Sequence, residues 1–122
     1  MKLLEIGFLG GLSMGLREEI VKKIRSAEVR PFDNIRFEKN TVYLRELPAE
    51  KLKYGYSTTI EMIIVMEEQN SNLYETLKGE IGTHGIYGSY FVQLITYGAE
   101  SPVLALDNLW IRKTSLKIIW EG

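Results

Sequence analysis

The stretch TTIEMIIVM, residues 58–66, decides the fold class of this 122-residue chain. It is apolar and rich in β-branched residues, and its one charge is at Glu61. Such residues are enriched in strands, and a strand that is apolar at nearly every position is covered on both of its faces. The sequence therefore predicts a central, buried β-strand here.

Further short strands are expected on both sides of this stretch, separated by turn residues. On the C-terminal side they cover Tyr90–Tyr97, Val103–Leu106, Leu109–Arg112 and Leu116–Trp120, the last two joined by a tight turn at Lys113–Ser115. On the N-terminal side the predictions are a strand at Leu3–Leu9, an extended segment at Glu28–Phe32, a hairpin of Ile35–Glu38 with Thr41–Leu44 around Lys39-Asn40, and a helical turn at Pro48–Leu52.

Two helices are expected. Residues 14–27 show apolar side chains at helical spacing behind Ser13 as N-cap, and residues 72–79 begin with a capping box at Asn72 and end at Gly79. Because strands follow one another rather than alternate with helices, the pattern predicts one α+β domain over residues 1–122. Its sheet should be mostly antiparallel and strongly curled, or closed into a small β-barrel.

Composition excludes several function classes. The chain has no cysteine, which removes disulfides, thiolate nucleophiles and sulfur-ligated zinc and indicates a reducing, cytoplasmic setting. Its uncharged apolar runs are too short and too glycine-rich for a membrane helix, so no membrane partner is expected. A single histidine argues against a metal site, and no cofactor is expected. Two glutamines beside thirteen isoleucines suggest a thermophile.

A glycine-rich segment, residues 79–88, is the first candidate site. It contains Thr83, His84 and Tyr87 and follows Lys78, so a flexible loop would present several polar groups to a ligand. His84 could also serve a small enzyme as general acid or base, although the sequence as a whole favours a protein that is not an enzyme. The alternative is that these glycines only allow the chain to turn.

A second candidate site is basic. Lys22, Arg25, Arg30 and Arg36 have Phe32 and Phe37 interleaved among them, and this combination is typical of surfaces that bind RNA phosphates and stack bases. The alternative is a solvated helix face with both phenylalanine rings in the core.

Three stretches together resemble small archaeal proteins with PUA-like and ASCH-like barrels: SAEVRPFDNI (26–35), TVYLRELPAEKLKYG (41–55) and YFVQLITYGAESPV (90–103). The resemblance covers about half of the chain and implies a small β-barrel with an early helix. Barrels of this class commonly bind RNA or nucleotides, but none of their functional motifs can be matched here residue by residue.

The sequence therefore supports three functional hypotheses. The first is a non-enzymatic, PUA-like module that binds RNA or a nucleotide. The second is a protein-interaction or homo-oligomeric domain that uses the apolar C-terminal strands, Leu109–Ile111 and Leu116–Trp120. The third is a small enzyme that uses His84.

Overall fold

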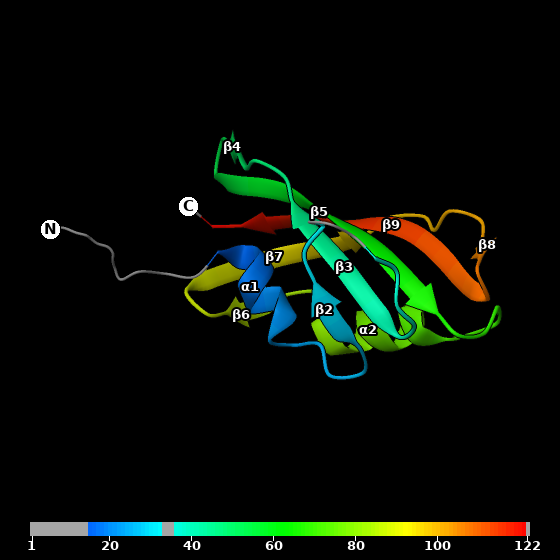
Figure 1. Cartoon of the computed structure of the whole chain (residues 1–122). Helices are drawn as coiled ribbons and strands as arrows, with labels where there is room; N and C mark the ends of the chain where they lie inside the picture. Colours follow the sequence, from blue (N-terminus) through cyan, green and yellow to red (C-terminus); the bar gives the residue numbers. More distant parts are fainter. Residues whose placement is uncertain (1–14, 33–35, 122) are drawn as a thin grey trace, which may run out of the picture.

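The structure is a computed structural model that describes residues 15–32 and 36–121. The predicted strand at Leu3–Leu9 and the predicted N-cap Ser13 lie outside these residues. Within these residues, two helices and eight strands follow one another (Figure 1). In order they are α1 (Leu16–Val21), β2 (Glu28–Arg30), β3 (Thr41–Glu46), β4 (Glu50–Leu52), β5 (Gly55–Met66), α2 (Leu73–Ile81), β6 (Gly85–Tyr87), β7 (Tyr90–Tyr97), β8 (Leu104–Leu106) and β9 (Leu109–Trp120).

All eight strands belong to one sheet, with the order β2-β3-β5-β9-β7-β6 and with β4 and β8 as extra partners of β5 and β9. Among the described strand pairs, β2–β3 alone is parallel. The long strands β5 and β9 pair from Tyr56↔Trp120 to Met66↔Trp110 and form the centre. The predicted central strand at 58–66 is confirmed as part of β5, and the predicted α+β class with a curled, mostly antiparallel sheet is confirmed.

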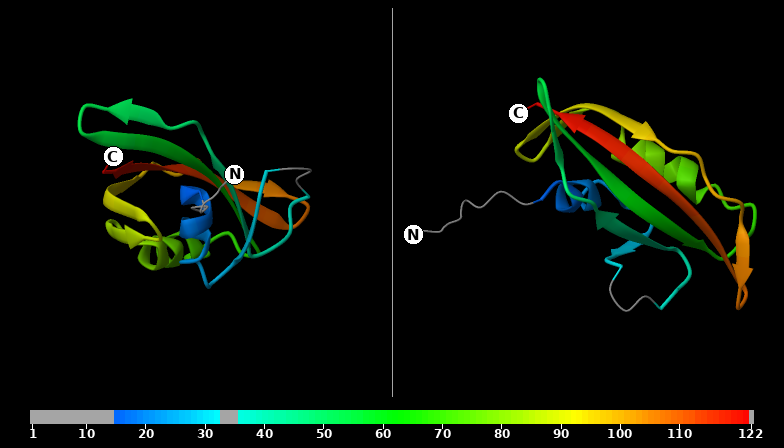
Figure 2. Two further views of the ribbon diagram at one scale, coloured as in Figure 1. Left: turned by 90° about the vertical axis from the view of Figure 1, so that its left-hand side faces the viewer. Right: turned by 90° about the horizontal axis from the view of Figure 1, so that it is seen from above.

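The sheet curls into a half-barrel, and both helices lie on its concave inner face (Figure 2). Within the described part of the chain the barrel stays open, because the terminal strands β2 and β6 are not paired with each other. The main core lies between the helices and the sheet and includes Leu16, Ile20, Ile64, Leu77 and Ile118. A smaller cluster on the outer face joins Tyr43, Ile63, Val65 and Ile111 to the partly buried Phe32, Phe37 and Leu109.

The C-terminal strand corrects one prediction. Residues 113–115 do not form a turn, because β9 runs without interruption from Leu109 to Trp120. Thr114 is buried in the middle of β9, where its hydroxyl donates to the Gly98 carbonyl at 2.9 Å and lies 3.2 Å from the Tyr74 hydroxyl. Pairing with β5 through this region outweighs the local turn preference of the Lys-Thr-Ser sequence.

Two further predictions are wrong, one around Pro48 and one around Asn40. Pro48–Leu52 is not helical, because residues 50–52 form β4 and pair with β5. The predicted hairpin around Lys39-Asn40 is also wrong, since residues 36–38 are not in a strand and β3 pairs in parallel with β2. Asn40 does adopt the expected left-handed conformation, with φ 55°.

Both helices differ from their predicted bounds. The first is only six residues long because the chain turns after Val21, and the carboxylate of Glu80 holds the following backbone at Arg25 and Ser26. The second continues past Gly79 to Ile81 and ends at Gly82. Part of the predicted glycine loop forms the short strand β6. No helix in the described residues is long and apolar enough to span a bilayer.

Two hairpin arms extend from opposite ends of the β5–β9 pair. We call residues 50–57 the β4 arm, which contains β4 and the start of β5, and residues 104–111 the β8 arm, which contains β8 and the start of β9. In both arms a proline lies where the outer strand breaks, Pro48 between β3 and β4 and Pro102 between β7 and β8. Figure 2 shows the two arms at the two ends of the molecule.

Candidate functional site

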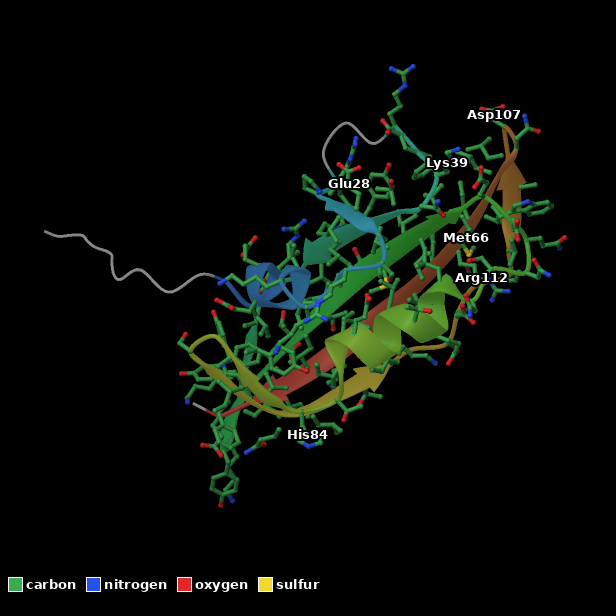
Figure 3. The ribbon with its side chains drawn as sticks, turned by 90° about the horizontal axis from the view of Figure 1, so that it is seen from below. Glu28, Lys39, Met66, His84, Asp107 and Arg112 are labelled. Atoms are coloured by element: carbon green, nitrogen blue, oxygen red, sulfur yellow. The ribbon has the colours of Figure 1, made fainter. Side chains whose placement is uncertain are left out.

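The residues of the glycine segment do not converge on one volume. His84 is exposed, and its Nδ1 lies 3.0 Å from the hydroxyl of its neighbour Thr83. Figure 3 shows His84 at the margin of the molecule, far from the tip of the β8 arm at Asp107. The ammonium of Lys78 is 3.0 Å from the Glu75 carboxylate and 4.7 Å from the centre of the Tyr74 ring. The hydrogen bond to Glu75 raises the pKa of Lys78.

Tyr87 belongs to the core rather than to a binding loop. Its ring is buried, and its hydroxyl donates to the carbonyl of Ile81. Burial raises the pKa of Tyr87, so the phenol stays protonated and acts as a structural donor. Tyr97 does the same beside it, donating to the Gly82 carbonyl, and burial raises the pKa of Tyr97 as well.

The glycines of this segment have a conformational role. Gly82, Gly85 and Gly88 all have positive φ, at 86°, 126° and 62°, where other residues are strained. Gly88 also leaves room for Glu19, because a Cβ at this position would lie 2.3 Å from the Glu19 carboxyl carbon. The turn interpretation therefore explains these glycines without a ligand, and the use of His84 in catalysis stays a prediction.

The four predicted basic contacts are divided by the fold. Arg30 lies between Glu28 and Glu38, at 3.1 and 3.3 Å, and its hydrogen bond to Glu28 raises its pKa. Arg36 is exposed, and its carbonyl accepts a hydrogen bond from Tyr43. Lys22 and Arg25 instead line a shared cleft next to α2.

This cleft has a volume of about 730 Å³. It is lined by three cations, two carboxylates and three smaller residues: Lys22, Lys23, Arg25, Glu19, Glu80, Thr76, Gly79 and Gly88. Lys22 lies 3.4 Å from Glu19, and Lys23 lies 5.0 Å from the centre of the Tyr87 ring. The basic helix end and part of the glycine segment thus meet at one concave surface, although Arg30 and Arg36 do not reach it.

Glu80 organises one wall of the cleft. Its Oε1 accepts hydrogen bonds from the backbone N–H of Arg25 at 3.1 Å and of Ser26 at 3.3 Å, and from the Ser26 hydroxyl at 2.9 Å. Desolvation opposes ionisation, but these donors outweigh it and lower the pKa of Glu80. The carboxylate is therefore engaged by the protein, which leaves the three cations a small excess in the cleft.

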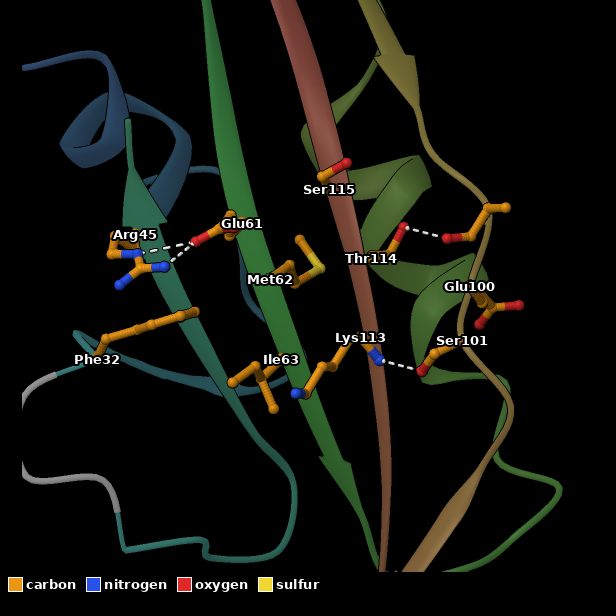
Figure 4. Close-up of a pocket in the computed structure, with 11 residues that line it drawn as sticks. Phe32, Arg45, Glu61, Met62, Ile63, Glu100, Ser101, Lys113, Thr114 and Ser115 are labelled. Atoms are coloured by element: carbon orange, nitrogen blue, oxygen red, sulfur yellow. Dashed lines mark hydrogen bonds and ion pairs between the residues drawn. The ribbon is translucent and has the colours of Figure 1, made fainter. Parts of the chain in front are cut away.

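A second hollow, of about 440 Å³, lies on the outer face of the sheet (Figure 4). Arg45 and Glu61 form an ion pair across β3 and β5, and the Arg45 guanidinium stacks 4.7 Å from the Phe32 ring centre. The Ser101 hydroxyl accepts the Lys113 backbone N–H at 2.8 Å and donates to the Pro102 carbonyl. With its hydrogen bonds directed to backbone groups, Ser101 shows no arrangement that would make it a nucleophile. Within the described ranges, no cluster of three acidic or histidine side chains could hold a metal ion.

The most unusual surface is the β8 arm. All three residues of β8 are exposed, with Leu104 at 55% and Leu106 at 45%, and none is charged. One side of β8 pairs with β9, and no described strand pairs with the other side. The arm turns at Asp107-Asn108, where φ is 50° and 66°, as in the type I′ turn of a tight hairpin.

The apolar stretches predicted from the sequence as an interaction surface are not the ones that are most exposed near this turn. Leu109–Ile111 and Leu116–Trp120 lie in the central strand β9, where Trp110 and Trp120 are partly buried against the core. The exposed leucines lie in β8, directly before the turn. The uncharged run VLAL after Pro102 was the available signal, because a strand that follows a proline and precedes a hairpin is often at an edge.

The β4 arm has a different surface. Its strand is also exposed, but it contains Glu50 and Lys51. The ammonium of Lys51 lies 4.7 Å from the centre of the Tyr56 ring, and that of Lys53 lies 5.3 Å from the Tyr54 ring. Tyr54, at the turn, is 81% exposed.

Comparison with known proteins shows a similar fold and no family. No known protein family matches the chain, and no curated protein does. One solved structure with a similar fold is a chain in the virion of a native gene transfer agent particle. The two chains are 7% identical with a TM-score of 0.50, and the alignment covers 88% of this chain and 92% of the other. At this identity the likeness concerns the fold alone.

Proposed function

We propose that this protein is a non-enzymatic structural subunit that associates with further copies of itself. The observation that carries the proposal is the edge strand β8, which is uncharged and has all three of its residues exposed, with no described strand paired to its outer side. Among the sequence-based hypotheses this is the homo-oligomeric one, but the proposed contact surface is now β8 instead of the stretches that lie in β9.

A free strand edge presents unpaired backbone N–H and C=O groups that can pair with another chain. Natural proteins usually protect such edges by keeping the strand very short, or with charged side chains, proline, a bulge or a covering segment. Strand β8 is short, at three residues, and the described part of the chain gives it no further protection. Residues 104–106 contain neither charge nor proline, and Pro102 lies before the strand. The edge is therefore suited to pairing with another strand.

The side chains of β8 support the same function. Leu104 and Leu106 pair with Ile111 and Leu109, so they lie on the outer face beside the small apolar cluster there. Large exposed apolar groups that adjoin one another typically mark interaction sites. A partner that covered both leucines would extend this cluster and bury it.

The structural comparison is consistent with this proposal. The chain with the similar fold is part of a virion particle. A chain of similar fold can therefore belong to a particle, and we extend that kind of role to this chain as part of the proposal.

Light scattering coupled to size-exclusion chromatography tests the proposal. The wild-type chain should show a mass above that of a monomer that rises with concentration. The double substitution Leu104→Lys, Leu106→Lys should reduce the mass to that of a monomer and leave the circular dichroism spectrum unchanged. A matched control, Thr96→Lys on β7, adds charge away from the arm and should associate as the wild type does. A wild type that stays monomeric at all concentrations would refute the proposal.

A second candidate function is binding of a phosphate-bearing ligand in the cleft beside α2. It is favoured by the meeting of Lys22, Lys23 and Arg25 there, and it retains the RNA or nucleotide partner that the PUA-like resemblance implies. Fluorescence anisotropy with a labelled oligouridine and with labelled ATP at low salt tests it. Binding that weakens steeply with salt and is lost in Lys23→Glu, Arg25→Glu would support it, and no binding at low salt would refute it.

A further inference from the structure

We infer that copies of the chain join head to tail. The edge of β8 that no described strand covers in one copy pairs with the corresponding edge of β4 in the next. This inference rests on the proposed function and specifies which surface of the second copy covers β8. Three features of the arms carry it: the direction of their backbone groups, the faces of their side chains and their charges.

The backbone of both arms offers a donor and an acceptor outward. In an antiparallel pair, hydrogen-bonded and non-hydrogen-bonded residue pairs alternate, and the pair that flanks a two-residue turn is hydrogen-bonded. Leu106 and Leu109 flank the turn of the β8 arm, so the N–H and C=O of Ala105 point away from β9. Leu52 and Gly55 flank the other turn, so the same groups of Lys51 point away from β5.

The side chains of the two arms have matching faces. Lys51 lies on the inner face over Tyr56, which stacks on Trp120. Because successive strand residues alternate between faces, Leu52 lies on the outer face, where Leu104 and Leu106 also lie. Leu52 is 37% exposed. Pairing of β4 with β8 in one continuous sheet would place leucine beside leucine on that face.

The charges of the two arms have opposite sign. The β8 arm contains one charged residue, Asp107 at its turn, and this carboxylate has no ion-pair partner among the described residues. The β4 arm contains Lys51 and Lys53 with one carboxylate, Glu50, which leaves it net positive. Two β8 arms meeting each other would bring like charges together, whereas β8 meeting β4 brings opposite charges together.

The positions of the arms determine the kind of assembly. They lie at opposite ends of β5 and β9, which are 12 residues each and hence about 40 Å long. A contact between β8 of one copy and β4 of the next is therefore heterologous and leaves one free arm at each end. Such contacts continue into a ring that closes or into an open filament.

The test uses one proline in each arm. Ala105→Pro removes the outward N–H of β8, and Lys51→Pro removes that of β4, while the pairing of each arm with its own long strand is retained. Ala105→Val and Lys51→Val are the matched controls that keep the N–H. Should either proline variant unfold, Leu104→Lys and Leu52→Lys replace them. Masses are measured by sedimentation equilibrium over a concentration series.

We expect wild type and both valine controls to form species larger than a dimer, and each proline variant alone to associate at least tenfold more weakly. Mixing the two proline variants should give a one-to-one dimer and nothing larger, because one brings only a free β4 and the other only a free β8. If Lys51→Pro alone still dimerises while Ala105→Pro does not, β8 pairs with itself, which overturns the head-to-tail inference and leaves the proposed function standing. If both proline variants assemble as the wild type does, another surface is responsible and both are overturned. A monomeric wild type also overturns both.

Discussion

The β4 arm and the β8 arm are built alike but have different edges. Each is a hairpin with a two-residue turn, in which a short outer strand pairs with one end of a long central strand. The β4 strand carries charges, whereas the β8 strand is apolar. The same backbone arrangement thus gives one edge that resists indiscriminate pairing and one that favours it. In the proposed assembly, strand composition rather than topology therefore determines which end of this sheet pairs most readily with another chain.

The largest expected difference between the arms concerns their tryptophans. Trp120, next to the β4 arm, stacks on Tyr56 and meets Tyr90 edge to face, each at 5.7 Å, whereas Trp110 beside the β8 arm has no ring contact among the described residues. Trp120→Ala should therefore lower the free energy of unfolding by about 3 kcal/mol and Trp110→Ala by about 2 kcal/mol. Urea denaturation measures both. Equal losses would mean that the ring contacts do not distinguish the arms.

Substitutions in the turns of the two arms should also differ in their effect on the free energy of unfolding. Asn108 has φ 66°, a conformation that asparagine tolerates and alanine does not, so Asn108→Ala should cost about 1 kcal/mol. Asn108→Gly should be close to neutral. In the β4 arm neither Lys53 nor Tyr54 has positive φ, and Tyr54→Ala should change stability by less than about 0.5 kcal/mol. Chemical denaturation of the three variants checks this, and a larger loss for Tyr54→Ala would contradict it.

The salt dependence of association measures how much the opposite charges of the two arms contribute to the contact. Each arm has a small net charge and is exposed, so the charged part of a β8–β4 contact should be worth less than about 1 kcal/mol. Raising the salt concentration well above the physiological level should weaken association by no more than about fivefold. Sedimentation at low and high salt measures the change. A loss of a hundredfold or more would show that ion pairs, and not the leucines, carry the contact.

The smallest effect on stability is expected at Glu80, which lies outside both arms and therefore serves as a reference for them. Its pKa is lowered in the folded state, so its contribution to stability is present above the ordinary glutamate pKa of about 4.3 and is lost as the pH falls through the folded value. Glu80→Gln should slightly lower the midpoint of thermal unfolding at pH 7, and the difference from wild type should vanish at strongly acidic pH. Association should be unchanged. A difference that persists in acid would mean that the charge of Glu80 is not the cause.

Strongly patterned segments could be predicted from the sequence, and segments with a weak local signal could not. Thr58–Met66 and Tyr90–Tyr97 were predicted as strands because apolar and β-branched residues leave no alternative. Lys113–Ser115 looks locally like a turn and Pro48–Leu52 like a helix start, yet residues 113–115 and 50–52 lie in strands because β5 supplies hydrogen-bond partners to both. Local propensity of a few tenths of a kcal/mol cannot outweigh such pairing.

The candidate sites show the same limit. Sequence reasoning selected His84, Thr83, Tyr87 and Lys78 because they are close along the chain, but the fold buries Tyr87 and pairs Lys78 with Glu75. Of the four predicted basic contacts, Lys22 and Arg25 lie together at one cleft, whereas Arg30 and Arg36 lie elsewhere. Nearness in sequence does not show where side chains point.

The sequence by itself determined the class of the protein: an α+β domain with a buried central strand, a curled and mostly antiparallel sheet, and no cysteine chemistry. These properties follow from composition and from apolar pattern, which act locally. Only the tertiary structure decided which strand lies at an edge. Whether a strand lies at an edge depends on whether a second strand pairs with it, and the strand's own sequence does not specify this. The sequence VLAL would also suit the middle of a sheet, but in β8 one side has no partner among the described residues.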